Sequence, residues 1–179
     1  SVLAALGANM NAIQFAGDQL PAMRAAYGAP PLSDAELSRQ AAGDAVFVAP
    51  ARFVAAATAS GAPSFLYHFD YVPVVRRAST PGAAHGSEIP FVFDSWDQLP
   101  MAARFLQPAD RRMAARMSAC WTSFARDGRP TCPNAPAWPA YTAAADPTMV
   151  FGPETRVELG YRRAQQDFIL RRMMSAGGR

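Results

Sequence analysis

The sequence has two histidines, and one of them, His85, has neighbours that suit acid–base chemistry. It lies in the small-residue segment GAAHGSEIPFVF, residues 82–93, with Gly86 after it and the carboxylate of Glu88 three positions on. An imidazole titrates near neutral pH, so it can act as a general base or bind a metal ion. The metal interpretation is weak because no second or third ligand lies close in the sequence. A general base requires a nucleophile and an orienting carboxylate.

The sequence contains no nucleophile motif to match His85. In the G-x-S-x-G elbow of many hydrolases, the serine sits on a sharp turn between a strand and a helix. Ser64, Ser87 and Ser175 each lack at least one of the two glycines that the elbow requires. Spacing alone therefore favours a structural or solvent-exposed histidine at position 85.

Three other polar residues near this loop have structural roles in our interpretation. His68 falls inside a predicted strand, where we expect a buried or half-buried ring with one hydrogen bond. Glu88 lies one helical turn from His85 and could pair with its ring or cap the helix that follows. Asp70 ends the strand and could anchor the same loop.

The composition describes one domain-sized segment, residues 1–179, with few charges. Half of the residues are apolar and 17% are charged, against about 25% in typical globular domains. Such a chain folds around a large core or belongs to a larger structure. The net charge is +3, but the arginines are scattered and are not interleaved with aromatic residues as in a nucleic-acid groove. We therefore expect no nucleic-acid partner.

The two cysteines, Cys120 and Cys132, do not have the spacing of a metal site. Together with two histidines they make no zinc site, and neither a metal nor an organic cofactor is implied. A disulfide between them is possible but cannot be inferred from the spacing. Cys120 falls on the apolar face of a predicted helix, so we expect a buried free thiol.

The ends and the hydropathy of the chain bear on its location. No stretch is predicted to be long and apolar enough to span a membrane. The first residues, SVLAALGANMNAIQF, have no basic region and no clean cleavage site, so we do not interpret them as a signal peptide. They also lack an initiator Met. We expect an upstream segment beyond this sequence, and the cellular location stays unknown.

Most of the predicted elements in the first third of the chain are helices. Residues 1–27 have apolar positions at helical spacing. A capping box at residues 33–36 begins a short helix. Asp44 is expected to cap the next helix, and Pro50 is expected to kink or break it.

Two strands and two further helices complete the prediction. Residues 64–72, SFLYHFDYV, have the strongest strand pattern, and residues 148–151 form a short edge strand. Residues 108–127 form the clearest helix, which Gly128 ends as its C-cap. Residues 159–174 form a terminal helix. The apolar face of the helix at 108–127 carries Met113, Met117, Cys120, Trp121 and Phe124.

Five stretches in a fixed order resemble the type B carboxylesterases, the family of the bacterial para-nitrobenzyl esterases and the cholinesterases. They are GDAVFVAPARFVAAATA at 43–59, SFLYHFDYVP at 64–73, AAHGSEIPFVFDS at 83–95, MSACWTSFARDGRP at 117–130 and AWPAYTAAADPTMVFG at 137–152. Each stretch alone is a weak signal, but five in register make the resemblance specific. It covers roughly residues 20–155 and corresponds to the C-terminal third of such an enzyme.

The resemblance implies an α/β fold, the C-terminal part of an α/β-hydrolase with mostly helices and one or two sheet strands at about 64–72 and 148–151. In this family the triad runs Ser, then Glu or Asp, then His along the chain. The H-G-x-E-[IL] pattern of the family places the catalytic histidine at His85. No other catalytic residue carries over, because the oxyanion glycines, the serine elbow and the acid all lie upstream in the family.

The resemblance therefore implies a carboxylic ester hydrolase that acts on small-molecule esters. The serine-bearing part would belong to the same gene or to a companion chain, and we expect the isolated chain to be inactive. The alternative is a non-catalytic, truncated or degenerate hydrolase fragment with a binding role or none. A small all-helical binding module is a third possibility, against which the strand at 64–72 argues. A G-x-S-x-G elbow ahead of residue 1 in the native product would distinguish the first interpretation from the second.

Overall fold

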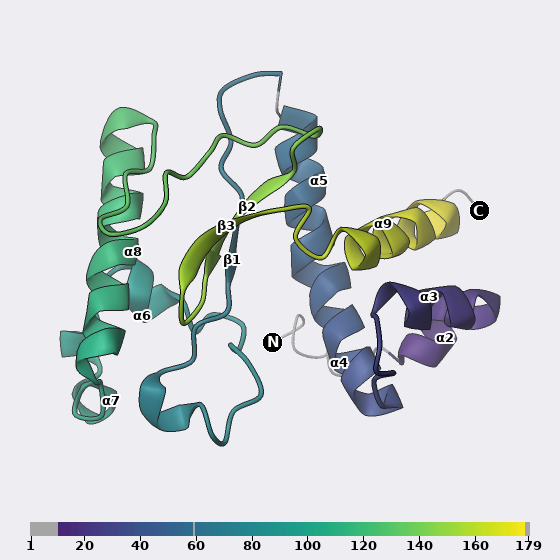
Figure 1. Ribbon diagram of the computed structural model, residues 1–179, viewed down its shortest axis with the longest axis horizontal. Coiled ribbons are helices and arrows are strands. Elements are labelled where there is room, and N and C mark those ends of the chain that lie inside the picture. The colour runs from purple at the N-terminus through teal and green to yellow at the C-terminus, as the bar shows by residue number, and fades with distance from the viewer. Residues whose placement is uncertain (1–10, 59, 178–179) are drawn as a thin grey trace. The chain divides into compact units, whose positions relative to one another are not determined.

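The computed structural model of the protein describes residues 11–58 and 60–177, and Figure 1 shows its helices and strands. The chain divides into two compact units: unit 1 is Ser1–Thr58 with Gly160–Arg179, and unit 2 is Ala59–Leu159. Unit 1 contains α2 (Ala12–Ala16), the 3-10 turn η1 (Gly17–Gln19), α3 (Leu20–Ala26), α4 (Asp34–Gly43), the π-helical segment η2 (Asp44–Val48), α5 (Ala49–Thr58) and α9 (Arg163–Gly177). Unit 2 contains β1 (Tyr67–Phe69), the 3-10 turn η3 (Val74–Arg76), α6 (Ile89–Val92), the 3-10 turn η4 (Trp96–Gln98), α7 (Pro100–Ala103), α8 (Pro108–Asp127), β2 (Pro147–Phe151) and β3 (Thr155–Leu159).

Asp44 is a buried charge inside a helical run, so the prediction that it caps a helix is wrong. Its carboxylate accepts a hydrogen bond from Tyr27 Oη at 2.7 Å and pairs with Arg162 at 2.7 Å. Burial of Tyr27 raises the pKa of its phenol, and the negative charge of Asp44 raises it further. Because a buried charge is costly without partners, these bonds favour the packing of α9 against α3 and η2 within unit 1.

The expected kink at Pro50 takes the form of the π-helical segment η2, which joins α4 to α5. A proline has no amide hydrogen and its ring clashes with the carbonyl four residues back. A π-helical turn just before the proline accommodates the missing hydrogen bond and the ring without ending the helix. The helical run Asp34–Thr58 therefore continues for 25 residues.

That run corrects the expectation about membrane-spanning segments. Among the described residues, Asp34–Thr58 is one helix whose length and composition would allow it to cross a bilayer. Core helices of soluble proteins meet the same criterion, so the finding is weak evidence for a membrane. Leu37, Ala41 and Ala49 of this run are buried in the core of unit 1.

The predicted helix starts are partly confirmed. Ser33 is the N-cap of α4, and its Oγ accepts the amide of Glu36 at 3.3 Å. The second half of the predicted capping box is absent, because the Glu36 carboxylate instead accepts bonds from Arg39 at 2.6 Å and Gln40 at 2.8 Å. The helix predicted over residues 1–27 is confirmed as the two shorter helices α2 and α3, and its first ten residues lie outside the described range.

The sheet of unit 2 has the order β1-β2-β3. β1 runs parallel to β2, with Tyr67 opposite Met149, and β2 runs antiparallel to β3, with Met149 opposite Val157. Neighbouring parallel strands need a long crossover connection. The crossover from β1 to β2 contains the loop with His85 and the helices α6, α7 and α8.

The sheet also corrects the strand predictions. The strand predicted at 64–72 is confirmed, but only its centre pairs in the sheet, and the edge strand at 148–151 is confirmed within β2. β3 was not predicted at all. The terminal helix was expected from Leu159, which instead ends β3, and α9 begins only at Arg163.

Helix α8 covers one face of the sheet (Figure 1). Met113 and Met117 are buried on its inner side, where they join Met149 and Phe151 of β2 in one hydrophobic cluster. The predicted C-cap is confirmed, since Gly128 has a φ of 68° and its amide donates to the carbonyl of Phe124. The apolar spacing of the sequence thus located both the helix and its buried face.

The predicted free thiol of Cys120 is wrong, because Cys120 and Cys132 form a disulfide with an S–S distance of 2.06 Å. Cys120 is fully buried, as its place on the apolar face required. The proline-rich loop after α8 returns along this helix, where the Thr131 amide donates to Ser123 Oγ at 2.7 Å. This fold-back brings Cys132 to the helix, and no feature of the cysteine spacing could have shown it.

Candidate functional site

His85 lies in a tight turn between the end of β1 and the start of α6. The amide of Ser87 donates to the carbonyl of Ala84 at 3.1 Å, and that of Ile89 to the carbonyl of Gly86 at 3.3 Å. Ser87 Oγ also donates to the Ala84 carbonyl, at 2.6 Å. These bonds define the backbone on both sides of His85, whose side chain is exposed. The ring is therefore accessible to a second group.

Gly86 is required by the backbone of this turn. Its φ is +80°, a left-handed conformation that costs other L-residues free energy. Space is not the constraint, since a β-carbon at this position would lie 3.7 Å from Ile89 Cδ1, an ordinary contact. The positive φ of this turn therefore explains why a glycine follows His85 in the sequence.

Asp110 of α8 anchors the start of the loop that leads to His85. Its carboxylate is fully buried and accepts bonds from Tyr71 Oη at 2.8 Å and from the Val74 amide at 3.0 Å. The same carboxylate accepts the Gln107 amide at 2.7 Å, which completes a capping box at the start of α8. One side chain therefore joins the helix terminus to the chain that leaves β1.

Tyr71 is held in this anchor from both sides. Arg77 donates Nε to the Val72 carbonyl at 3.0 Å, and its guanidinium carbon lies 5.0 Å from the centre of the Tyr71 ring. Burial, together with the hydrogen bond to Asp110, raises the pKa of the Tyr71 phenol to about 12. Tyr71 is therefore neutral at physiological pH and donates its proton to the carboxylate.

Phe91 of α6 anchors the end of the same loop. It is 1% exposed, and its ring centre lies 5.5 Å from that of Tyr71, 4.9 Å from that of Trp96 and 5.4 Å from that of Phe69. Aromatic pairs at such distances add stability beyond their buried area. In the apolar run after His85, Phe91 is therefore the main anchor and Val92 packs partly buried against the same cluster, while Ile89 and Phe93 are mostly exposed.

The two carboxylates expected to support the loop behave differently from the prediction. Glu88 is the N-cap of α6, but its side chain makes no capping bond. Its charge acts on Tyr67 of β1: burial raises the pKa of the Tyr67 phenol, and the nearby Glu88 carboxylate raises it further. The Asp70 side chain is exposed, and its amide donates to the Phe151 carbonyl at 2.8 Å. The side-chain anchor is therefore Asp110, which the sequence analysis missed.

A signal for Asp110 was present in the sequence. Proline at the first position of a helix and an acidic residue at the third form the start of a capping motif. Pro108 and Asp110 have this spacing. The second role of the carboxylate, as acceptor for Tyr71 and Val74, depends on the tertiary structure and leaves no local pattern.

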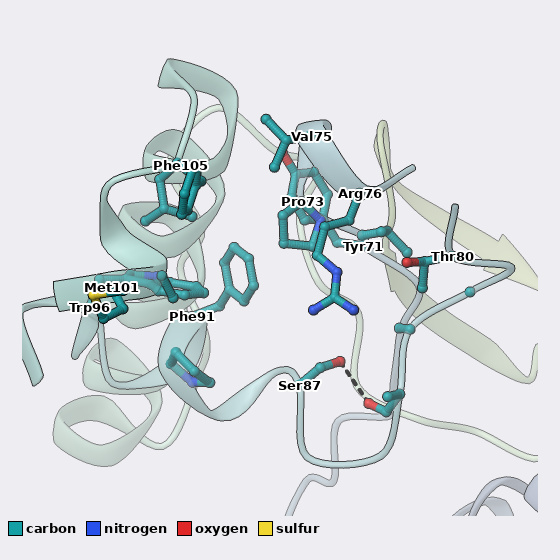
Figure 2. Close-up of a pocket in the computed structure, with 17 residues that line it drawn as sticks. Tyr71, Pro73, Val75, Arg76, Thr80, Ser87, Phe91, Trp96, Met101 and Phe105 are labelled. Carbon is teal, nitrogen blue, oxygen red and sulfur yellow. Dashed lines mark hydrogen bonds between the residues drawn. The ribbon is translucent and has the colours of Figure 1, made fainter. Parts of the chain in front are cut away.

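A cavity of about 590 Å³ lies beside the His85 turn in unit 2. Residues 82–84 and Ser87, on either side of His85 in the chain, line it, and so do Phe91, Trp96 and Phe105. Figure 2 shows Phe91, Trp96 and Phe105 around the cavity, with the bond from Ser87 at its edge. The size is within the range of about 300–1,000 Å³ of small-molecule sites. The turn therefore presents His85 next to a space that an apolar ligand could fill.

The other histidine does not join this site. His68 is half-buried in β1, as predicted, and is not among the residues around the cavity. Among the described residues, no group of three or more His, Cys, Asp or Glu side chains is arranged to hold a metal ion. The chemistry that this part of the chain can offer is therefore that of an exposed imidazole next to an apolar cavity.

The fold and the site define a class of protein. The chain is similar in structure to a PNB esterase, with a TM-score of 0.66 and 25% sequence identity over 94% of this chain and 32% of that one. A Geobacillus stearothermophilus carboxylesterase aligns with a TM-score of 0.62 and 34% identity over 81% of this chain and 31% of its own. The predicted fold class, part of an α/β-hydrolase fold, is confirmed.

Sequence comparison gives the family. The profile of the Carboxylesterase family matches residues 31–169. The chain therefore belongs to the Carboxylesterase family, and the resemblance found in its five motifs is confirmed. The para-nitrobenzyl esterase of Bacillus subtilis (strain 168) is 31% identical over 116 residues, which are 64% of this chain and 23% of that protein. Human cocaine esterase is 32% identical over 103 residues, 55% of this chain and 18% of its own. The chain spans about a quarter or less of these curated relatives.

Proposed function

We propose that this chain supplies the triad histidine, His85, of a serine hydrolase that cleaves carboxylic esters of small molecules. The observation that carries the proposal is the position of His85 in the H-G-x-E pattern of a Carboxylesterase family member. Further support comes from the left-handed Gly86 and from the exposed ring beside an apolar cavity.

In this mechanism His85 moves a proton twice in each half-reaction. It takes the proton of the serine hydroxyl as the oxygen attacks the ester carbonyl, and it gives that proton to the leaving alcohol. Water then replaces the alcohol: His85 takes a proton from water, which attacks the acyl-serine, and returns it to the serine oxygen as the acid leaves. The side chain of His85 is exposed, so a serine outside this sequence can approach its ring.

The serine and the acid of the triad have no counterpart in this sequence, which has no G-x-S-x-G segment. The proposed partner is therefore the part of the hydrolase domain that lies upstream in the family, in the same gene or on a companion chain. A histidine without its serine gives little acceleration. The isolated chain of 179 residues is expected to be inactive towards esters.

The proposal is tested by labelling the source extract with a fluorophosphonate, which reacts with the activated serine of serine hydrolases. The intact mass of every species that contains peptides of this sequence is then measured. A labelled species about three times the 19.2 kDa of this chain, or a labelled companion that co-purifies with it, is expected. An unlabelled 19.2 kDa species without a companion would overturn the proposal and favour a non-catalytic fragment.

Two matched variants of the labelled species test the role of His85 itself. His85→Gln should slow ester hydrolysis by about a thousandfold or more, since triad residues act as a unit. His68→Gln, which changes the second histidine of the chain, should leave the rate within about threefold, as expected for a residue that touches no reacting group. Equal rates for the two variants would exclude His85 as the base.

A further inference from the structure

The cavity beside His85 contains one charged side chain, that of Arg76. Most of its wall is apolar, from Val75, Phe91, Met101, Phe105 and other residues. None of the described residues that line it is acidic. Figure 2 shows the Arg76 side chain extending from its turn into the cavity, on the side of Ser87.

Arg76 and its neighbour Arg77 have different surroundings. Arg77 is committed to the loop through the Val72 carbonyl and the Tyr71 ring. The side chain of Arg76, by contrast, makes no hydrogen bond or ion pair with another residue in the part of the chain that the structure describes. A guanidinium in this state keeps all of its five donors for a ligand, and a carboxylate matches its planar fork.

A second donor lies on the same wall. Thr80 lines the cavity, is half-buried, and its hydroxyl likewise has no partner among the described residues. The hydroxyl of Ser87 is already used by the Ala84 carbonyl. The polar side-chain groups of the cavity that have no partner among the described residues are therefore all donors: the Arg76 guanidinium, the Thr80 hydroxyl and the buried Trp96 Nε1. Such a set favours a negatively charged oxygen.

We infer that this cavity binds an apolar monocarboxylate, with its carboxylate on Arg76 and Thr80 and its hydrocarbon body against Phe91, Trp96, Met101 and Phe105. The charge of Arg76 complements the carboxylate, and the apolar wall complements the body of the ligand. A neutral apolar molecule would use the wall but leave the guanidinium unpaired. A polar anion would pair with Arg76 and leave the wall empty.

The place of such a ligand in a reaction rests on the proposed function. Hydrolysis of an ester releases a carboxylic acid, so the cavity next to His85 would hold the acid product, or an ester that carries a second carboxylate. The binding itself needs no serine and no turnover. It can therefore be measured on the chain as it is, whether or not the chain takes part in catalysis.

The test is a chemical-shift titration of the 179-residue chain with octanoate, and with octan-1-ol as the neutral molecule of equal chain length. Methyl groups of Ala83, Ala102 and Met101, all at the cavity, are observed. Octanoate is expected to shift these signals in the wild type. In Arg76→Gln its dissociation constant should rise about tenfold or more, because one charge-assisted pair is lost. The octan-1-ol affinity should be the same in both proteins.

Arg112→Gln is the charge-matched control, because Arg112 is exposed on α8 and does not line the cavity. It should bind octanoate as the wild type does. Ala102→Trp fills the cavity and should abolish the binding of both ligands, while an unchanged melting temperature shows that the chain is folded. Octanoate binding that is unchanged in Arg76→Gln, or shifts confined to other parts of the chain, would overturn the inference. The two proposals can fail separately. Absence of octanoate binding would not contradict the proposed role of His85, and absence of esterase activity would not contradict octanoate binding.

Discussion

Replacement of Asp110 by alanine should destabilise unit 2 more than any other single change to a polar residue around the His85 loop. The carboxylate is fully buried and accepts three hydrogen bonds, from Tyr71 Oη, the Val74 amide and the Gln107 amide. Alanine removes the acceptor and leaves all three donors in place. Two of these donors, the Tyr71 phenol and the Val74 amide, lie in the chain that leads into the loop.

The magnitude follows from the number of orphaned donors. A hydrogen bond to a charged group contributes about 1.5–3 kcal/mol, and an unsatisfied buried donor costs about 1–3 kcal/mol. Because the three bonds share one carboxylate, their contributions are not additive. We expect Asp110→Ala to lower the free energy of unfolding by about 3–5 kcal/mol, as in other losses of one partner from a buried charged network.

The contribution of Tyr71 is separated by a double-mutant cycle. Tyr71→Phe removes one donor and leaves the carboxylate with two amides. If the phenol and the carboxylate interact as their distance of 2.8 Å indicates, the coupling free energy of the pair should be about 1–2 kcal/mol. A coupling near zero would mean that the two groups contribute to stability independently.

The assay is urea unfolding followed by tryptophan fluorescence, which reports on unit 2 because all three tryptophans, Trp96, Trp121 and Trp138, lie in that unit. Asp127→Ala is the control: Asp127 is an exposed carboxylate at the other end of α8, paired with Arg126. It should change the stability by no more than about 0.5 kcal/mol. Equal effects of the two substitutions would refute the reasoning that Asp110 anchors the loop.

Three further predictions concern the same unit. Cys132→Ser opens the disulfide across a separation of 12 residues, which should lower the free energy of unfolding by about 3 kcal/mol on the loop-entropy account; a change below about 1 kcal/mol in the urea titration would contradict it. Gly86→Ala places a β-carbon on a residue with a φ of +80°, so it should cost about 1–2 kcal/mol; Gly82→Ala, where an added β-carbon meets nothing within 4 Å, should cost less, and the reverse order would argue against the strained turn. Burial and the hydrogen bond to Asp110 raise the pKa of Tyr71 from its ordinary value of 10.0 to about 12 in the folded chain. The unfolded chain therefore binds fewer protons than the folded one between these values, so the stability from this group is complete below pH 10 and is lost as the pH rises towards 12. Tyr71→Phe should make the free energy of unfolding fall less steeply between pH 10 and 12. If the free energy of unfolding falls equally with pH in the two proteins, the effect is excluded.

Sequence patterns correctly predicted those features of the fold that depend only on neighbouring residues. The spacing of Met113 and Met117 identified the buried face of α8, and Gly128 identified its end, because both depend on helical geometry alone. β3 escaped prediction because its polar and exposed residues, such as Arg156, gain a strand conformation only by pairing with β2. The disulfide escaped for a similar reason, since the return of the chain along α8 is a tertiary event.

The candidate site divides in the same way. The type of His85 and its small-residue neighbours drew attention to this loop, but spacing alone favoured a structural or exposed histidine, and only the family resemblance gave it a catalytic role. Asp44 has the residue type and place of a helix cap, yet Tyr27 and Arg162 take it into a buried cluster. Asp110 and Arg76 show the same limit: their sequence context identifies a helix start and a surface arginine, and only the fold shows what they face.

The groups that hold the His85 turn all belong to unit 2. Asp110 acts on the chain before the turn, Gly86 within it and Phe91 after it, and none of them depends on a residue of unit 1 for the contacts described. A general base contributes most when its orientation is set before the substrate arrives. If His85 is the base proposed here, the backbone of its turn is therefore fixed within this segment, and the upstream part supplies the serine and the acid that orients the ring. On this account, Asp110→Ala in the assembled enzyme should lower kcat more than it raises KM, because it loosens the base without touching the substrate. A rise in KM alone would place the effect of Asp110 on the cavity and not on the histidine.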